Sequence, residues 1–232
     1  MLVIGKVARA AVALAALATF AGCSSDDSAP DNANLDANEM RGALLQAADI
    51  GPTWAAPDDP TQDDPNKLVS ICGGTTTPPP VPPGATVVSA PFADEGDSGA
   101  QSLYQIALVY GNASGAQAAS TALRTLSNNC AAKVSVPAQV ASDKSEPAYT
   151  ETAEIQPLTQ KSWTGFVVIR HKEYEAKHPG TADTAVAILR TRNVVLVDTY
   201  GIYRIGTSGP SVNTDFAANW QKLVGTVVNN VG

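Results

Sequence analysis

The sequence predicts an α+β domain with a central, mainly antiparallel sheet of five or six strands packed by two or three helices. Two runs in strand-like segments, 166–169 and 194–197, are apolar at every position, so both faces of the sheet should be covered. The last segment, 213–231, carries large apolar residues at spacings of four, three, four and four, which predicts an amphipathic helix on the sheet. Its apolar stripe consists of Phe216, Trp220, Leu223, Val227 and Val231.

The N-terminal segment has the composition of an export signal. Lys6 and Arg9 precede an uncharged apolar run, 10–21. This run is too short to span a bilayer as a permanent helix. The run ends in Ala-Gly before Cys23, and a cysteine directly after two small residues resembles a bacterial lipobox. In such signals the cysteine is acylated and becomes the new N-terminus, which predicts a signal peptide over 1–22 and a lipoprotein. A plain secretory signal with an incidental cysteine is the alternative.

The charge of the mature chain restricts its partners. Removal of the signal peptide leaves 210 of the 232 residues, enough for one domain, and lowers the formal charge from −7 by the two basic residues to −9. So acidic a chain is not expected to bind nucleic acid. No basic cluster adjoins Cys23, so charge cannot hold the protein to anionic lipid. The acyl chains would have to anchor it alone, and stable anchoring requires at least two chains.

Two cysteines remain in the mature chain, Cys72 and Cys130. Exported proteins meet oxidising conditions, so one disulfide between them is the default expectation. Two unpaired buried thiols are the alternative, and a zinc site is disfavoured because neither cysteine has CxxC spacing or a histidine partner. Cys130 continues the apolar stripe of a helix predicted over 113–129, which favours a structural bond over a reactive thiol.

The other elements are predicted from local patterns. Residues 23–38 are small and polar and should form a flexible tether, which leaves 39–232 as the folded domain. A first helix is expected over 39–50, and the Pro-rich stretch 57–83 should stay out of the sheet interior. Residues 133–147 are polar and interrupted by proline. The predicted strands are 86–92, 102–110 and a short 148–155, followed by a meander of 163–174, 184–191 and 193–203 with turns at 178–180 and 190–193.

The search for an active site predicts no enzyme, no catalytic residue and no cofactor. The sequence has no nucleophile elbow, phosphate-binding loop or dinucleotide fingerprint. Aromatic residues with a polar tip suit a cleft for ligands of mixed polarity, although most such residues in a small domain belong to the core. The residues expected to line a ligand cleft are Trp54, Tyr104, Trp163, Arg170 and Tyr200.

A metal site at 171–178 is considered and not predicted. On a strand, His171 would share one side with Glu173 and Glu175, and His178 could return from the turn. Imidazole and carboxylate groups bind divalent metals. Lysines interrupt the stretch, however, and a solvated hairpin tip is the preferred interpretation.

The order of several short motifs resembles a known family. Leu44-Leu45 and Asp49-Ile50 stand in the opening helix, Cys72 follows in a loop, and a helix closes in Cys130-Ala131. Trp163 and the run 193–197 precede the final helix. Over residues 40–231 this order resembles the PknH-like extracellular sensor domain, found on mycobacterial receptor serine/threonine kinases and on stand-alone actinobacterial lipoproteins. The resemblance implies an α+β domain with a central antiparallel sheet, a cleft for an unidentified ligand and no catalytic residues to carry over. Family members typically have two disulfides, whereas this chain has cysteines for one.

The expected function is a lipid-anchored, non-enzymatic binding or sensor domain on the outer face of the cytoplasmic membrane. The chain shows no transmembrane helix or kinase domain, so any signal is expected to pass through a membrane partner. A carrier of lipid or another apolar molecule is the runner-up, and it would require a large apolar cavity. An exported hydrolase or metalloenzyme is the third class, and it would require His171 and His178 to converge.

Overall fold

The computed structural model describes residues 33–57, 66–96, 99–140, 145–207 and 214–231. The chain divides into two units, 1–31 and 32–232, and the description below concerns the second. The predicted signal peptide and Cys23 lie outside the described residues. In the described part, no helix combines the length and the apolar character that crossing a membrane would need.

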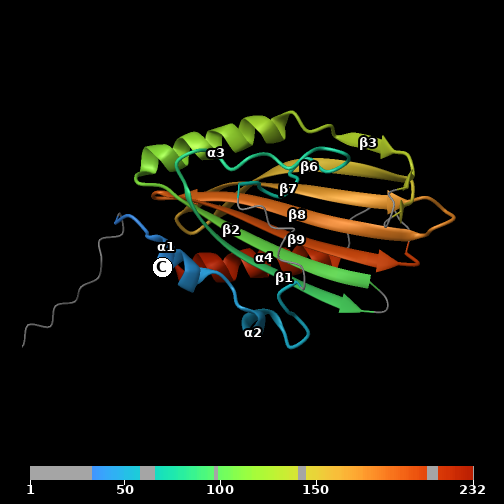
Figure 1. The fold of residues 1–232 in the computed structure, drawn as a ribbon, viewed down its shortest axis with the longest axis horizontal. Coiled ribbons are helices and arrows are strands. Elements are labelled where there is room, and N and C mark those ends of the chain that lie inside the picture. Colours follow the sequence, from blue (N-terminus) through green and yellow to red (C-terminus); the bar gives the residue numbers. More distant parts are fainter. Residues whose placement is uncertain (1–32, 58–65, 97–98, 141–144, 208–213, 232) are drawn as a thin grey trace, which may run out of the picture. The chain divides into compact units, whose positions relative to one another are not determined.

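The domain is built on a seven-stranded antiparallel sheet (Figure 1). The spatial order is β1-β2-β9-β8-β7-β6-β3, and every neighbouring pair is antiparallel. The predicted α+β class is therefore confirmed, with more strands than the five or six expected. The strands are β1 (Thr86–Gly96), β2 (Gly99–Val109), β3 (Lys133–Val136), β6 (Tyr149–Gln160), β7 (Trp163–Tyr174), β8 (Gly180–Thr191) and β9 (Val194–Ile205).

The extra strands come from the polar stretch 133–147. β3 is four residues long and pairs with β6 at the edge of the sheet, while β4 (Gln139–Val140) and β5 (Ser145–Glu146) form a separate two-stranded ladder. Such short strands carry too few residues to show alternation, which is why no strand was expected here. β6 extends to Gln160, five residues beyond the predicted end, because it has β7 as a full-length partner.

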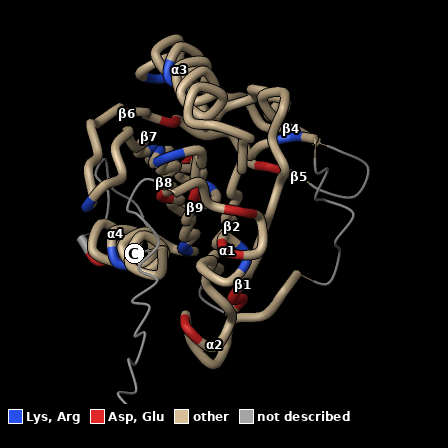
Figure 2. The backbone as a smooth tube through the Cα atoms, turned by 90° about the vertical axis from the view of Figure 1, so that its left-hand side faces the viewer, with Lys and Arg blue, Asp and Glu red and all other residues tan. Residues whose placement is uncertain are grey.

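Helices cover both faces of the sheet, as its doubly apolar strands predict. They are α1 (Ala37–Ala43), α2 (Ala47–Ile50), α3 (Ala113–Asn128) and α4 (Thr214–Asn230). Figure 2 shows α3 and α4 on opposite sides of the sheet. In β9, Val194 and Leu196 point into the core under α1 and α4, and Val195 and Val197 point into the core under α3. We refer to these two sides as the α4 face and the α3 face.

The predicted first helix, 39–50, is wrong as a continuous element. It is broken at Leu44, whose extended backbone (φ −63°, ψ 146°) ends α1, and α2 begins at Ala47. The break inserts Leu44 and Leu45 together into the core, and the Leu45 N–H donates to Oε1 of Gln105 at 2.9 Å. A tertiary hydrogen bond thus replaces the helical one that local periodicity predicts.

The chain entering α1 is fixed to the sheet by Asn193. Its buried amide accepts from the Leu35 N–H at 2.8 Å and donates to the carbonyls of Leu35 (2.9 Å) and Tyr110 (2.6 Å). Asp36 then caps α1 with a capping box to Glu39. Ordered structure therefore begins before residue 39, the expected start of the folded domain.

Cys72 and Cys130 form the expected disulfide, 58 residues apart in sequence. The bond joins the residues just after α3 to the loop that runs from Asn66 to the start of β1. Leu68 and Ile71 of this loop are buried in the core of the α3 face. The cross-link therefore holds a segment without regular structure against the sheet.

Candidate functional site

A cleft of about 150 Å³ lies on the α4 face, between α2, α4 and strands β2 and β9. We call it the Trp54–Tyr200 cleft, and it contains two of the five residues expected to line a ligand site. Its apolar side is made by Leu45, Ile50, Trp54 and Leu223. Its polar side is made by Asp49, Gln101, Tyr200, Asn219, Lys222 and Thr226.

Trp54 is held at the cleft by the chain around it. Its backbone N–H donates to the carbonyl of Gly51 at 3.3 Å, and a Cβ on Gly51 would lie 3.3 Å from the indole Cδ1. The next residue, Ala55, exchanges two backbone hydrogen bonds with Ala93 of β1. The indole is therefore fixed between the end of α2 and the edge of the sheet, half-buried with one side open to the cleft.

Tyr200 forms the floor of the cleft. Its ring stacks on Phe216 of α4 at 5.6 Å between centroids, and its hydroxyl donates to Oε1 of Gln101 at 2.6 Å. Burial raises the pKa of this hydroxyl, against the opposing effects of a hydrogen bond from Asn219 and the charge of Arg204. The phenol is therefore neutral at physiological pH and acts as a fixed hydrogen-bonding group.

A buried polar chain supports the cleft from below. Gln105 accepts from the Leu45 N–H and donates through Nε2 to Oδ2 of Asp198 at 2.6 Å. All three residues are at most 1% exposed. Because Leu45 also lines the cleft, Gln105 sets the position of the cleft wall relative to the sheet.

Asp198 makes the stability of the domain depend on pH. Burial raises the pKa of its carboxyl to about 7, and the hydrogen bond from Gln105 only partly opposes this. The folded state therefore binds a proton more tightly than the unfolded state. Its contribution is present below pH 4 and is lost as the pH rises from about 4 to 7.

Asp198→Asn should remove that loss. We expect the variant to gain stability relative to the wild type as the pH rises, by about 4 kcal/mol between pH 4 and pH 8. Urea unfolding at a series of pH values measures the difference, in which all other titrating groups cancel. A pH-independent difference between the two proteins would contradict the assignment.

The other three expected cleft residues lie elsewhere. Trp163 is completely buried in the core of the α4 face. Tyr104 and Arg170 lie on the α3 face, where Tyr104 packs on the core and Arg170 pairs with Glu151 at 3.5 Å. The structure therefore brings together Trp54 and Tyr200 alone among the five.

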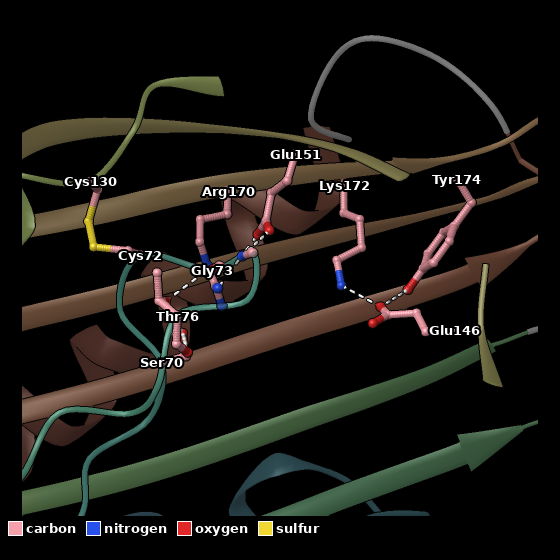
Figure 3. A network of polar contacts seen from close by, with 11 residues as sticks. Ser70, Cys72, Gly73, Thr76, Cys130, Glu146, Glu151, Arg170, Lys172 and Tyr174 are labelled. Atoms are coloured by element: carbon pink, nitrogen blue, oxygen red, sulfur yellow. Dashed lines mark hydrogen bonds and ion pairs between the residues drawn. A yellow bond between two sulfur atoms is a disulfide. The ribbon is translucent and has the colours of Figure 1, made fainter. Parts of the chain in front are cut away.

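Arg170 belongs to a polar network beside the disulfide (Figure 3). Oε2 of Glu151 accepts from the N–H of Gly74 at 2.6 Å, two residues after Cys72. A Cβ on Gly73 would overlap the Glu151 carboxylate, and Gly73 adopts a positive φ of 71°. The loop thus packs its backbone directly on the ion pair, which is a structural role for Arg170.

A second group on the same face ties β5 to the sheet. Glu146 accepts from Nζ of Lys172 at 2.8 Å and from the hydroxyl of Tyr174 at 3.1 Å (Figure 3). The Lys172 ammonium also lies 3.9 Å from the centre of the Tyr149 ring. These contacts hold the ladder of β4 and β5 against β6 and β7.

The interpretation of 171–178 as a solvated hairpin tip is wrong for His171. Its side chain is buried, and Nδ1 lies 2.6 Å from Oδ1 of Asp183 on β8, its direct cross-strand neighbour. His178 is exposed in the turn, so the two histidines do not converge. Within the described ranges, no group of three or more His, Cys, Asp and Glu could hold a metal ion.

Sequence reasoning missed the polar residues of the cleft. Asn219, Lys222 and Thr226 lie along one flank of α4, beside its apolar stripe, at spacings of three and four. That spacing is a readable signal of a shared helix edge. Gln101 gave no signal, because its role depends on Tyr200, a hydrogen-bonding partner 99 residues away.

Fold and cleft together define an α+β domain with a small cleft beside α2 and α4. No family model matches the sequence, and no curated protein matches it. In structure the chain is similar to the crystallised extracellular domain of PknH from Mycobacterium tuberculosis, with a TM-score of 0.47 and 17% identity. The match covers 85% of this chain and 99% of that domain, which is the domain that the sequence resembles.

Proposed function

We propose that the chain is an exported, lipid-anchored binding or sensor domain that takes a small ligand in the Trp54–Tyr200 cleft. The observation that carries the proposal is the cleft itself, where an aromatic platform faces fixed hydrogen-bonding groups. An apolar cavity of about 150 Å³ holds a single benzene ring, so the cleft has the size for one ring of a ligand.

The location rests on two independent features. The disulfide between Cys72 and Cys130 is of the kind that persists in oxidising compartments outside the cytoplasm. The basic, apolar and small-residue order before Cys23 is that of a lipoprotein signal. Together they support a position on the outer face of the cytoplasmic membrane, with the acyl chains of Cys23 as the anchor and a membrane protein as the partner that receives any signal.

The groups in the cleft favour binding over catalysis. Among the described residues that line it there is no His, Cys or Ser. The Asp49 carboxylate accepts from the N–H of Gln46 and so caps α2, and the Tyr200 phenol is kept neutral by burial. Neither is arranged as an activated nucleophile or base.

Native mass spectrometry tests the proposal. The full-length protein, purified in detergent from the envelope of its own cells, should retain a small molecule and carry acyl groups on Cys23. Trp54→Ala should lose the small molecule, while Tyr104→Ala, which truncates an aromatic residue on the opposite face, should keep it. Retention by the Trp54 variant, or a wild-type protein that is soluble and unacylated, would contradict the proposal.

The carrier hypothesis finds little support in the packing. It requires a large apolar cavity between the sheet and the helices. In the described part, both faces of the sheet are instead filled by buried side chains, such as Phe216 and Trp220 of α4 on one face and Ile106 and Phe166 under α3 on the other.

A further inference from the structure

A second hollow adjoins the Trp54–Tyr200 cleft on the α4 face. It has a volume of about 350 Å³ and lies over the ends of β1, β2 and β9. Gln101 lines both the hollow and the cleft, so the two adjoin along β2. A ligand that passes over the Gln101 side chain reaches both spaces.

Two glycines on the floor of the second hollow place no side chain in it. Gly96 and Gly99 are directly paired across β1 and β2, and Arg204 lies opposite Gly99 on β9. A Cβ on Gly99 would overlap the carbonyl oxygen of Tyr203, so no other residue fits there without moving the strand. The space above these glycines is therefore set by the backbone of the sheet and does not depend on the rotamer of a side chain.

Planar polar groups line the path between the two spaces. The Gln101 amide accepts from Tyr200 and donates to Oδ2 of Asp94 at 3.4 Å. At the far side, Arg204 is oriented by Asp183 at 3.7 Å, and this carboxylate is itself 2% exposed and paired with His171. One ion pair leaves further N–H groups of the guanidinium for a ligand, since arginine has five donors.

The described residues that line the combined site carry no excess of positive charge. Their carboxylates are Asp49 and Asp94, and their cations are Lys222 and Arg204. Asp183 pairs with Arg204, so these groups do not select an anion. A neutral ligand with hydroxyl groups and flat apolar ring faces matches an indole platform followed by amide, carboxylate and guanidinium groups.

We infer that the cleft and the second hollow form one elongated site for an uncharged oligosaccharide. One sugar ring lies on Trp54, and the following units extend past Gln101 to Asp94 and Arg204. The second hollow has about twice the volume of the cleft, so the combined site is longer than a single sugar unit. The inference rests on the proposed function and names the ligand class of the same site.

Calorimetric titration of the full-length lipoprotein tests this in lauryldimethylamine oxide, a detergent without a sugar headgroup. The probes are maltotriose, cellotriose and triacetylchitotriose, with glucose, N-acetylglucosamine and anionic trigalacturonate for comparison. We expect at least one neutral trisaccharide to bind at least tenfold more tightly than its single unit and than trigalacturonate.

Two variants separate the parts of the site. Trp54→Ala should abolish binding of trisaccharide and single unit, whereas Asp94→Ala should weaken the trisaccharide at least tenfold and leave the single unit within twofold. Trp54→Phe, which keeps a smaller ring face, should retain intermediate affinity and guards against a misfolded alanine variant. Failure of all three neutral trisaccharides to bind would overturn the inference, as would an Asp94 variant that weakens both ligands equally.

A molecule that is retained from the envelope, lost in Trp54→Ala and identified by mass as something other than a saccharide would leave the binding function intact. It would overturn the saccharide assignment alone.

Discussion

Replacing Cys72 and Cys130 by serine should lower the free energy of unfolding by about 4 kcal/mol. The bond closes a loop that spans 58 residues, and on the chain-entropy model a loop of this length contributes about that much. The folded state also depends on the cross-link, because the loop buries Leu68 and Ile71 without regular structure of its own. Urea unfolding followed by tryptophan fluorescence measures the difference.

Dithiothreitol provides the matched control. It should destabilise the wild type to the level of the double serine variant and leave that variant unchanged. A loss of less than 1 kcal/mol would show that the contacts of Glu151 with the loop suffice to hold it. The domain would then have no physical need for an oxidising compartment, which would weaken the proposed location.

Local pattern predicts the long elements of this fold well. β7 spans the predicted residues 163–174, and α4 differs from its predicted range by one residue at each end. β7 carries a continuous apolar run that is covered on both sides, and α4 has one apolar stripe of period 3.6. The break between α1 and α2 was missed because it depends on Gln105, 60 positions from Leu45.

The same reason limits prediction of the site. Aromatic residues with polar tips were expected to line a cleft, but their type does not say which face of the sheet each one occupies. Tyr104 and Tyr200 are separated by the pairing of β2 with β9, in which Leu103 lies opposite Tyr200 and Tyr104 opposite Thr199. That register joins strands almost 100 residues apart and has no local signal.

His171 illustrates a partner hidden by distance. A polar residue near the end of a strand suggests exposure, yet its neighbour on β8 is Asp183, which lay one residue before the predicted strand. The strand begins at Gly180, so the pairing extends far enough to bury both side chains. The buried pair in turn orients Arg204, so an error in one strand boundary also hid one wall of the proposed saccharide site.

Gln105→Leu should cost about 4 kcal/mol at pH 7, because it removes two buried hydrogen bonds at once. The Leu45 N–H loses its acceptor, and the Asp198 carboxylate loses the side-chain donor that opposes its burial. Since Leu45 lines the cleft, ligand retention should fail along with stability. Gln117→Leu, at an exposed position on α3, is the matched control and should change stability by less than about 0.5 kcal/mol.

A double variant shows whether the Gln105–Asp198 pair acts as a unit. With Asp198→Asn already present there is no buried carboxylate to leave unpaired, so Gln105→Leu should cost only the unsatisfied Leu45 N–H, about 1 to 3 kcal/mol. Urea unfolding of the four proteins at pH 8 gives the coupling energy directly. Equal costs of Gln105→Leu in both backgrounds would mean that the pair is uncoupled, and the position of the cleft wall would then depend on the packing of Leu44 and Leu45 alone.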